Sequence, residues 1–165
     1  MSDLGKILKT GVVRFALVLP GPIERVWEYL TDIERLPDWF GTGVMEPYEG
    51  GVVNFMGGHI RGVVTQWKPP RKLAYTWNVF SPGETESAFP ESYLTFELQP
   101  RGKDVLLALT HLPIPEEFES RTAMGWHTFL DMLGGGLRGE EPKPRMDYME
   151  KNAALYGVDF KNLPK

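Results

Sequence analysis

The chain has 165 residues, a size that favours one domain able to bury an apolar core without a metal ion or a disulfide. It contains no cysteine, which excludes thiol catalysis, disulfides and cysteine-ligated zinc and is typical of a cytoplasmic protein. The formal net charge of −4 and the scattered lysines and arginines argue against nucleic acid as a partner.

The first predicted element is a β-strand. Large apolar residues alternate along 11–19, which is typical of a strand with one buried face. The apolar run that begins at Val12 is interrupted by Arg14 and is too short to span a bilayer. We therefore expect neither a signal peptide nor an integral membrane protein.

Two helical segments are expected to follow this strand. Pro22 suits the first position of a helix, and the apolar spacing after it predicts a helix over 22–31. Only a short helical turn fits within 33–40, because Pro37 restricts the backbone of the residue before it.

The middle of the chain predicts six strands, since the apolar period changes from helical to two and short turn sequences separate the segments. Such short connections favour antiparallel pairing. Only the loop 81–90 is long enough to act as a flap. The predicted strands are 44–48, 52–56, 59–68, 72–80, 92–99 and 104–112.

A long helix is predicted over 116–133, with the glycines Gly134 to Gly136 as its stop and a flexible exit. "GGGLRG" satisfies a G-x-G-x-x-G pattern, but it follows a helix and lacks the strand that phosphate binding requires. We expect one domain over 1–165, with a core of about 12–137 and an extension, 138–165, that carries a short helix near 146–156. The long helix is the element able to cover the sheet, so its apolar stripe should face the concave side.

Several segments, taken in order, resemble the START-like, SRPBCC helix-grip superfamily, in the branch of activators of the heat-shock protein 90 ATPase. These segments include "GPIERVWEYLTDIERLPDWF", "GVVTQWKPPRKLAYTW", "YLTFELQPRG" and "GWHTFLDML". The resemblance implies an α+β fold in which a curved antiparallel sheet wraps around the long last helix, with two short helices after the first strand and a cavity between sheet and helix. Eukaryotic activators carry a further N-terminal domain that these segments do not match, so we do not extend chaperone stimulation to this chain.

The last helix places Trp126, Phe129, Leu130 and Leu133 on one face. Gly125 costs about 1 kcal/mol of helix propensity relative to alanine, which is useful where backbones approach closely or where space is left for a ligand. The stripe is interpreted either as ordinary core or as a pocket wall. Both interpretations can be true in this fold, because the end of the stripe nearer the cavity would form its wall while the other end packs as core.

The strand over 72–80 is expected to turn Tyr75 and Trp77 toward the helix, where their polar atoms need partners. His111 is a candidate for orienting a substrate or moving a proton. The predicted ligand-binding residues are Phe55, Tyr75, Trp77, Phe96, Trp126, Phe129 and Leu130 as walls, with Asn78 and His111 as polar contacts.

No catalytic constellation, metal site or cofactor site is predicted. The three histidines share no metal-ligand spacing, and His127 is better explained by a surface ion pair with Asp131, one helical turn away. The acidic residues of both helices are interpreted as solvent-facing side chains. The sequence contains no G-x-S-x-G nucleophile motif.

The leading hypothesis is a protein that binds a small hydrophobic or aromatic molecule, or a lipid, in the cavity. Two alternatives stay open: a cyclase- or hydrolase-like enzyme that uses the same cavity, and a co-chaperone-type interaction module. No residue pattern supports a chaperone partner, and the sequence specifies neither the ligand nor the oligomeric state.

Overall fold

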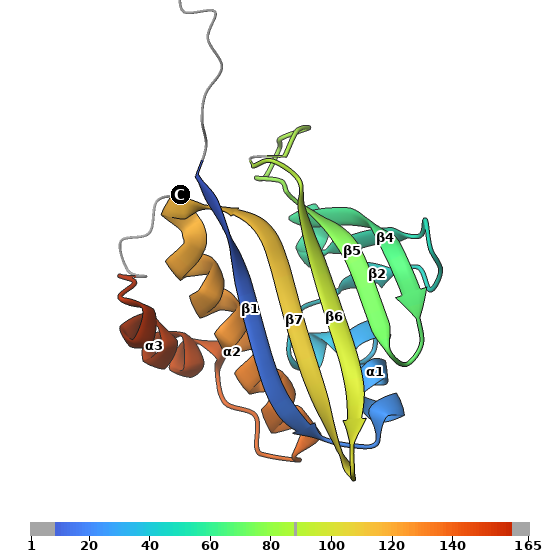
Figure 1. The fold of residues 1–165 in the computed structure, drawn as a ribbon. Coiled ribbons are helices and arrows are strands. Elements are labelled where there is room, and N and C mark those ends of the chain that lie inside the picture. The colour runs from blue at the N-terminus through green and yellow to red at the C-terminus, as the bar shows by residue number, and fades with distance from the viewer. Residues whose placement is uncertain (1–8, 88, 160–165) are drawn as a thin grey trace, which may run out of the picture.

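One antiparallel sheet of seven strands, in the order β1-β7-β6-β5-β4-β3-β2, organises the chain (Figure 1). The computed structural model describes residues 9–87 and 89–159, so both ends of the predicted domain lie outside the described residues. The strands are β1 (Thr10–Pro20), β2 (Gly43–Met45), β3 (Val52–Phe55), β4 (Ile60–Lys68), β5 (Lys72–Val79), β6 (Ser92–Arg101) and β7 (Asp104–Pro115).

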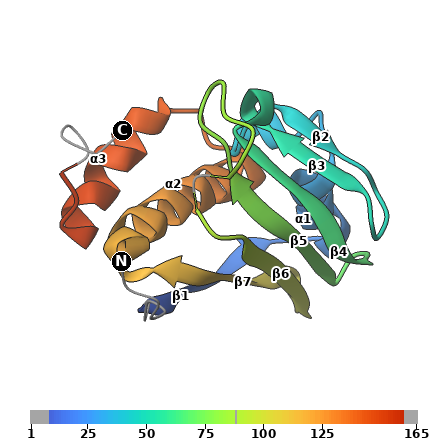
Figure 2. The same cartoon turned by 90° about the horizontal axis from the view of Figure 1, so that it is seen from above.

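The long helix α2 lies across the concave face of this sheet, and α3 packs against α2 on the side away from β4 and β5 (Figure 2). The α+β helix-grip architecture predicted from the sequence is therefore confirmed. The helices are α1 (Ile23–Thr31), η1 (Leu36–Asp38), η2 (Met56–Gly58), η3 (Glu116–Phe118), α2 (Glu119–Leu137) and α3 (Arg145–Tyr156). Within the described residues, none of them combines the length and apolarity needed to cross a bilayer.

The strand register explains which side chains face α2. Val13 pairs with His111, His111 with Leu94, and Leu94 with Tyr75, so one row crosses β1, β7, β6 and β5. All four side chains are buried. Because successive residues of a strand point to opposite faces, this row places an imidazole among apolar side chains on the helix-facing side.

The predicted stop of the long helix at Gly134 is wrong, because α2 continues to Leu137. Here tertiary packing outweighs the low helix propensity of glycine. A Cβ atom at Gly136 would lie 3.3 Å from the ring of Tyr29, so glycine allows α1 to approach α2 closely. The chain leaves the helix at Gly139, whose φ of +71° is the left-handed conformation typical of a helix C-terminus.

The extension is fastened to α2 by buried polar contacts. Asn152 of α3 is fully buried, and its Nδ2 donates to Thr128 Oγ1 at 3.1 Å and to Asp131 Oδ2 at 3.0 Å. Arg145 Nη2 donates to the carbonyl of Phe40 at 2.9 Å. The carboxylate of Asp131 also pairs with the exposed Lys151 at 3.0 Å.

We expect Asn152→Ala to destabilise the docking of α3, because it leaves Thr128 without this partner and opens a void. The cost should be about 1–2 kcal/mol of unfolding free energy. Lys151→Ala is the control, since an exposed ion pair contributes at most about 1 kcal/mol. Urea unfolding, together with proteolysis of α3, measures both variants. Equal losses of unfolding free energy in the two variants would show that Asn152 does not specifically hold α3 on α2.

Candidate ligand-binding cavity

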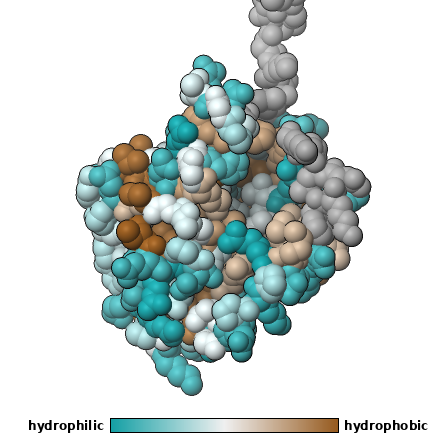
Figure 3. All heavy atoms as spheres, turned by 180° about the vertical axis from the view of Figure 1, so that it is seen from behind, coloured by the Kyte–Doolittle hydropathy of each residue, from teal (hydrophilic) through white to brown (hydrophobic). Residues whose placement is uncertain are grey.

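A partly enclosed cavity of about 240 Å³ lies between the first half of α2, the adjoining parts of β5, β6 and β7, and the end of the segment 81–90. Seen from the helix side, the molecular surface is hollowed beside this segment (Figure 3). Most of the lining is apolar. The lining residues are Trp77, Val79, Phe89, Pro90, Ser92, His111, Pro113, Ile114, Pro115, Phe118, Arg121, Thr122, Gly125, Trp126 and Phe129.

Four of the nine predicted site residues line this cavity: Trp77, His111, Trp126 and Phe129. The other five do not. Phe55, Tyr75, Phe96 and Leu130 are buried in the core instead. Asn78 lies outside the cavity, and its Nδ2 donates to Glu91 Oε2 at 3.0 Å at the protein surface.

Phe40 separates these core residues from the cavity. It fills part of the space between α2 and the sheet that was predicted to be open. Its ring centroid lies 5.1 Å from Phe55 and 4.9 Å from Phe129, and its ring stacks on Trp126 at 6.0 Å. Phe40 has no exposed surface. The space between α2 and the sheet is therefore confined to the N-terminal half of the helix, while Leu133 and Leu137 pack in the core.

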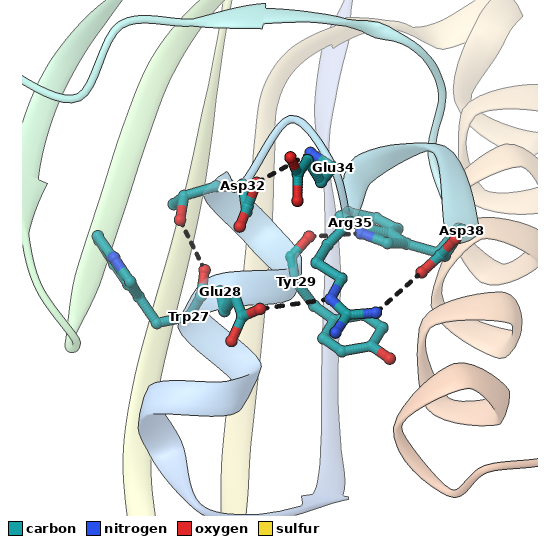
Figure 4. Close-up of polar contacts among 9 residues, drawn as sticks. Trp27, Glu28, Tyr29, Asp32, Glu34, Arg35 and Asp38 are labelled. Atoms are coloured by element: carbon teal, nitrogen blue, oxygen red, sulfur yellow. Dashed lines mark hydrogen bonds and ion pairs between the residues drawn. The ribbon is translucent and has the colours of Figure 1, made fainter.

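Polar contacts around η1 hold Phe40 and its neighbour Trp39 in place. Arg35 bridges the carboxylates of Glu28 and Asp38, at 3.3 and 3.8 Å (Figure 4). The indole Nε1 of Trp39 donates to the carbonyl of Tyr29 at 2.7 Å. These contacts fix the turn that inserts both rings into the core. Sequence reasoning missed this insertion, although two large rings directly after a proline break were the available signal.

His111 belongs to a hydrogen-bonded chain in the cavity wall. Its Nδ1 accepts a bond from Trp126 Nε1 at 3.0 Å, and its Nε2 lies 2.7 Å from Ser92 Oγ. Because an indole nitrogen only donates, Nδ1 carries no proton and Nε2 donates to Ser92. Ser92 Oγ in turn donates to the carbonyl of Trp77 at 3.4 Å.

Burial determines the charge of this imidazole. His111 is 2% exposed and lies within β7, between Val13 of β1 and Leu94 of β6. Burial lowers its pKa to about 4, and the ring is neutral at pH 7. Neither ring nitrogen is free, because each already has a partner in the wall.

The position of His127 agrees with its interpretation from the sequence. His127 Nε2 lies 3.6 Å from Asp131 Oδ1, as predicted for an ion pair one turn apart. Its Nδ1 lies 2.8 Å from the hydroxyl of Tyr156 in α3. In the part of the chain that the structure describes, no group of three or more acidic or histidine side chains could hold a metal ion.

The mouth of the cavity is built by residues that the sequence did not single out. The ring of Phe89 packs against that of Phe118 with centroids 4.7 Å apart, and the guanidinium of Arg121 lies 5.5 Å from the Phe118 centroid. Ser87 anchors the segment 81–90, because its hydroxyl accepts from the backbone N–H of Val79 and donates to the carbonyl of Phe89. The segment that was predicted as a flap thus contributes one side of the mouth.

Gly125 leaves open space in the wall. A Cβ atom built on it meets no atom within 4 Å outside its own stretch of helix. Of the two reasons that the sequence suggested for a glycine here, the structure favours space beside the helix over close backbone contact.

Comparison with known proteins places the chain among relatives of the same fold. The family described as "Activator of Hsp90 ATPase homolog 1-like protein" matches residues 20–137. No curated protein sequence matches the chain.

Solved structures with this fold include the protein encoded by BPP1335 of Bordetella parapertussis, with 27% identity, a TM-score of 0.70, and 99% of this chain and 92% of that chain covered. CalU16 from Micromonospora echinospora has 23% identity, covers 92% of this chain and 97% of its own, and has a TM-score of 0.69. The Aha1 dimer from Colwellia psychrerythraea has 18% identity, a TM-score of 0.63, and 77% and 96% coverage. With its family match and the helix-grip fold, the chain belongs to the Activator of Hsp90 ATPase homolog 1-like family of the START-like superfamily.

Proposed function

We propose that the chain binds a small hydrophobic, largely aromatic molecule in the cavity beside α2. The observation that carries this proposal is the open space next to Gly125, bordered by the rings of Trp77, Trp126 and Phe129. An apolar cavity of about 150 Å³ is large enough for benzene. A cavity of about 240 Å³ therefore suits two fused rings or one ring with a short substituent.

Apolar burial alone provides useful affinity for such a ligand. Removing about 300 Å² of apolar surface from water contributes roughly 7 kcal/mol before the cost of association. Micromolar binding is thus within reach, and the rings of the wall add favourable edge and stacking contacts.

Two further uses of the cavity and fold have less support. Acid–base catalysis in the cavity would draw on His111, but both of its nitrogens are engaged in the wall. We therefore assign His111 to the shape of the cavity and to the position of Trp126. Nothing in the described surface favours a chaperone partner over a small molecule.

Filling the cavity from the helix tests the proposal. Gly125→Leu places a side chain in the open space and replaces glycine with a better helix former, so the variant should stay folded. We expect a panel of naphthalene derivatives to change the tryptophan fluorescence and raise the Tm of the wild-type chain. Gly125→Leu should weaken that binding by at least about tenfold.

Ser120→Leu is the matched control, since it adds the same side chain to an exposed position of α2 that does not line the cavity. It should bind as the wild-type chain does. A wild-type chain that responds to no member of the panel, or a Gly125→Leu variant with unchanged affinity, would contradict the proposal.

A further inference from the structure

Arg121 is the one charged side chain among the described residues that line the cavity. It stands in the first turn of α2, at the mouth, with its guanidinium 5.5 Å from the centroid of the Phe118 ring. A cation near a helix N-terminus is opposed by the helix dipole, which favours an anion there. The helix dipole therefore does not account for an arginine at this position.

No hydrogen bond or ion pair within residues 9–87 and 89–159 involves the Arg121 guanidinium. Arg145, the other partly buried arginine, donates to the carbonyl of Phe40. Three glutamates lie close in sequence, yet none pairs with Arg121. Glu116 and Glu117 are exposed, and the carboxylate of Glu119 lies against Gly11 on β1.

Deeper in the cavity no charged side chain of the described residues lines the wall. His111 and Ser92 satisfy each other, and His111 also accepts from the Trp126 indole. The remaining wall is formed mainly by aromatic rings and prolines. A charged ligand group buried there would lose its hydration without compensation, so any anionic group must lie at the mouth.

This inference rests on the proposed function. We propose that the ligand is an aromatic acid of one or two rings, with its rings in the open space beside Gly125, packed against Trp126 and Phe129, and its carboxylate on the guanidinium of Arg121. A guanidinium binds a carboxylate through two parallel hydrogen bonds, which gives direction as well as affinity. Arg121 then selects acids over neutral molecules of the same shape.

The test compares naphthalene-2-carboxylate with the neutral naphthalene-2-carboxamide, which has nearly the same shape. Calorimetric titration of the wild-type chain should show binding of the acid about tenfold tighter than that of the amide. Arg121→Gln should remove this preference, because it weakens binding of the acid about tenfold more than binding of the amide. Arg101→Gln is the control, because it removes the same charge from an exposed position outside the cavity lining.

The outcomes separate this inference from the proposed function. Equal wild-type affinity for acid and amide overturns the inference about the acid and leaves aromatic binding in the cavity intact. Binding of neither probe counts against both. A preference for the acid that persists in Arg121→Gln overturns the role of Arg121.

Discussion

Replacement of Phe40 by alanine is expected to lower the free energy of unfolding by about 3–5 kcal/mol. Phe40 is fully buried and contacts the rings of Phe55, Trp126 and Phe129, so the truncation leaves a void in the centre of the aromatic core. The cost combines the lost transfer free energy of the ring with the cavity that the rigid neighbours cannot close. Trp126 also loses its stacking partner, so its near-ultraviolet circular dichroism should change.

Urea unfolding followed by tryptophan fluorescence measures this loss, with Phe89→Ala as the control. Phe89 is 37% exposed and lies at the mouth of the cavity, so the same truncation should cost no more than about 1 kcal/mol. Similar losses in the two variants would show that Phe40 is not the centre of the packing.

The stability of the fold is expected to fall as the pH drops from about 6.5 to 4, because of His111. Burial lowers the pKa of this imidazole to about 4 in the folded chain, while the unfolded chain keeps the ordinary value of 6.5. Between these values the unfolded chain binds a proton that the folded chain does not, which favours unfolding. The contribution is complete above pH 6.5 and reaches a loss of about 3 kcal/mol near pH 4.

His111→Gln isolates this effect from the titration of the carboxylates, since it keeps a neutral polar group at the position. The stability difference between the wild-type chain and the variant should narrow by about 3 kcal/mol between pH 7 and 4. Urea unfolding at a series of pH values provides the measurement, and nuclear magnetic resonance of the wild-type imidazole is an independent one. Parallel pH profiles, or protonation of His111 near pH 6, would contradict the expectation.

The fold was predictable because its determinants are local. Alternation along 11–19 and the helical spacing after Pro22 reflect which face of each element is buried, and the structure confirms both elements. The end of α2 was not predictable in this way. Gly134 to Gly136 are poor helix formers, and they remain helical because of packing against groups such as the Tyr29 ring, which the sequence pattern does not reveal.

The site was predictable only in part, for a similar reason. The stripe on the last helix and the glycine beside it identified Trp126, Phe129 and an open position at Gly125, all of which line the cavity. Phe40 comes from a turn far away in sequence, and its insertion decides which predicted residues become core. The mouth of the cavity likewise depends on how the segment 81–90 packs beside α2. The apolar periodicity of the sequence does not predict this contact.

The three consecutive glycines make the last turn of α2 intrinsically less stable than the rest of the helix. Relative to alanine they cost roughly 3 kcal/mol of intrinsic helix propensity, so the last turn depends on its neighbours, including the guanidinium of Arg25 that caps the carbonyl of Leu137. Amide hydrogens of Gly136 and Leu137 should therefore exchange with solvent through brief local opening, well before those around Trp126. Local opening of this last turn is thus separated from the aromatic half of the same helix, where α3 is attached through Thr128 and Asp131.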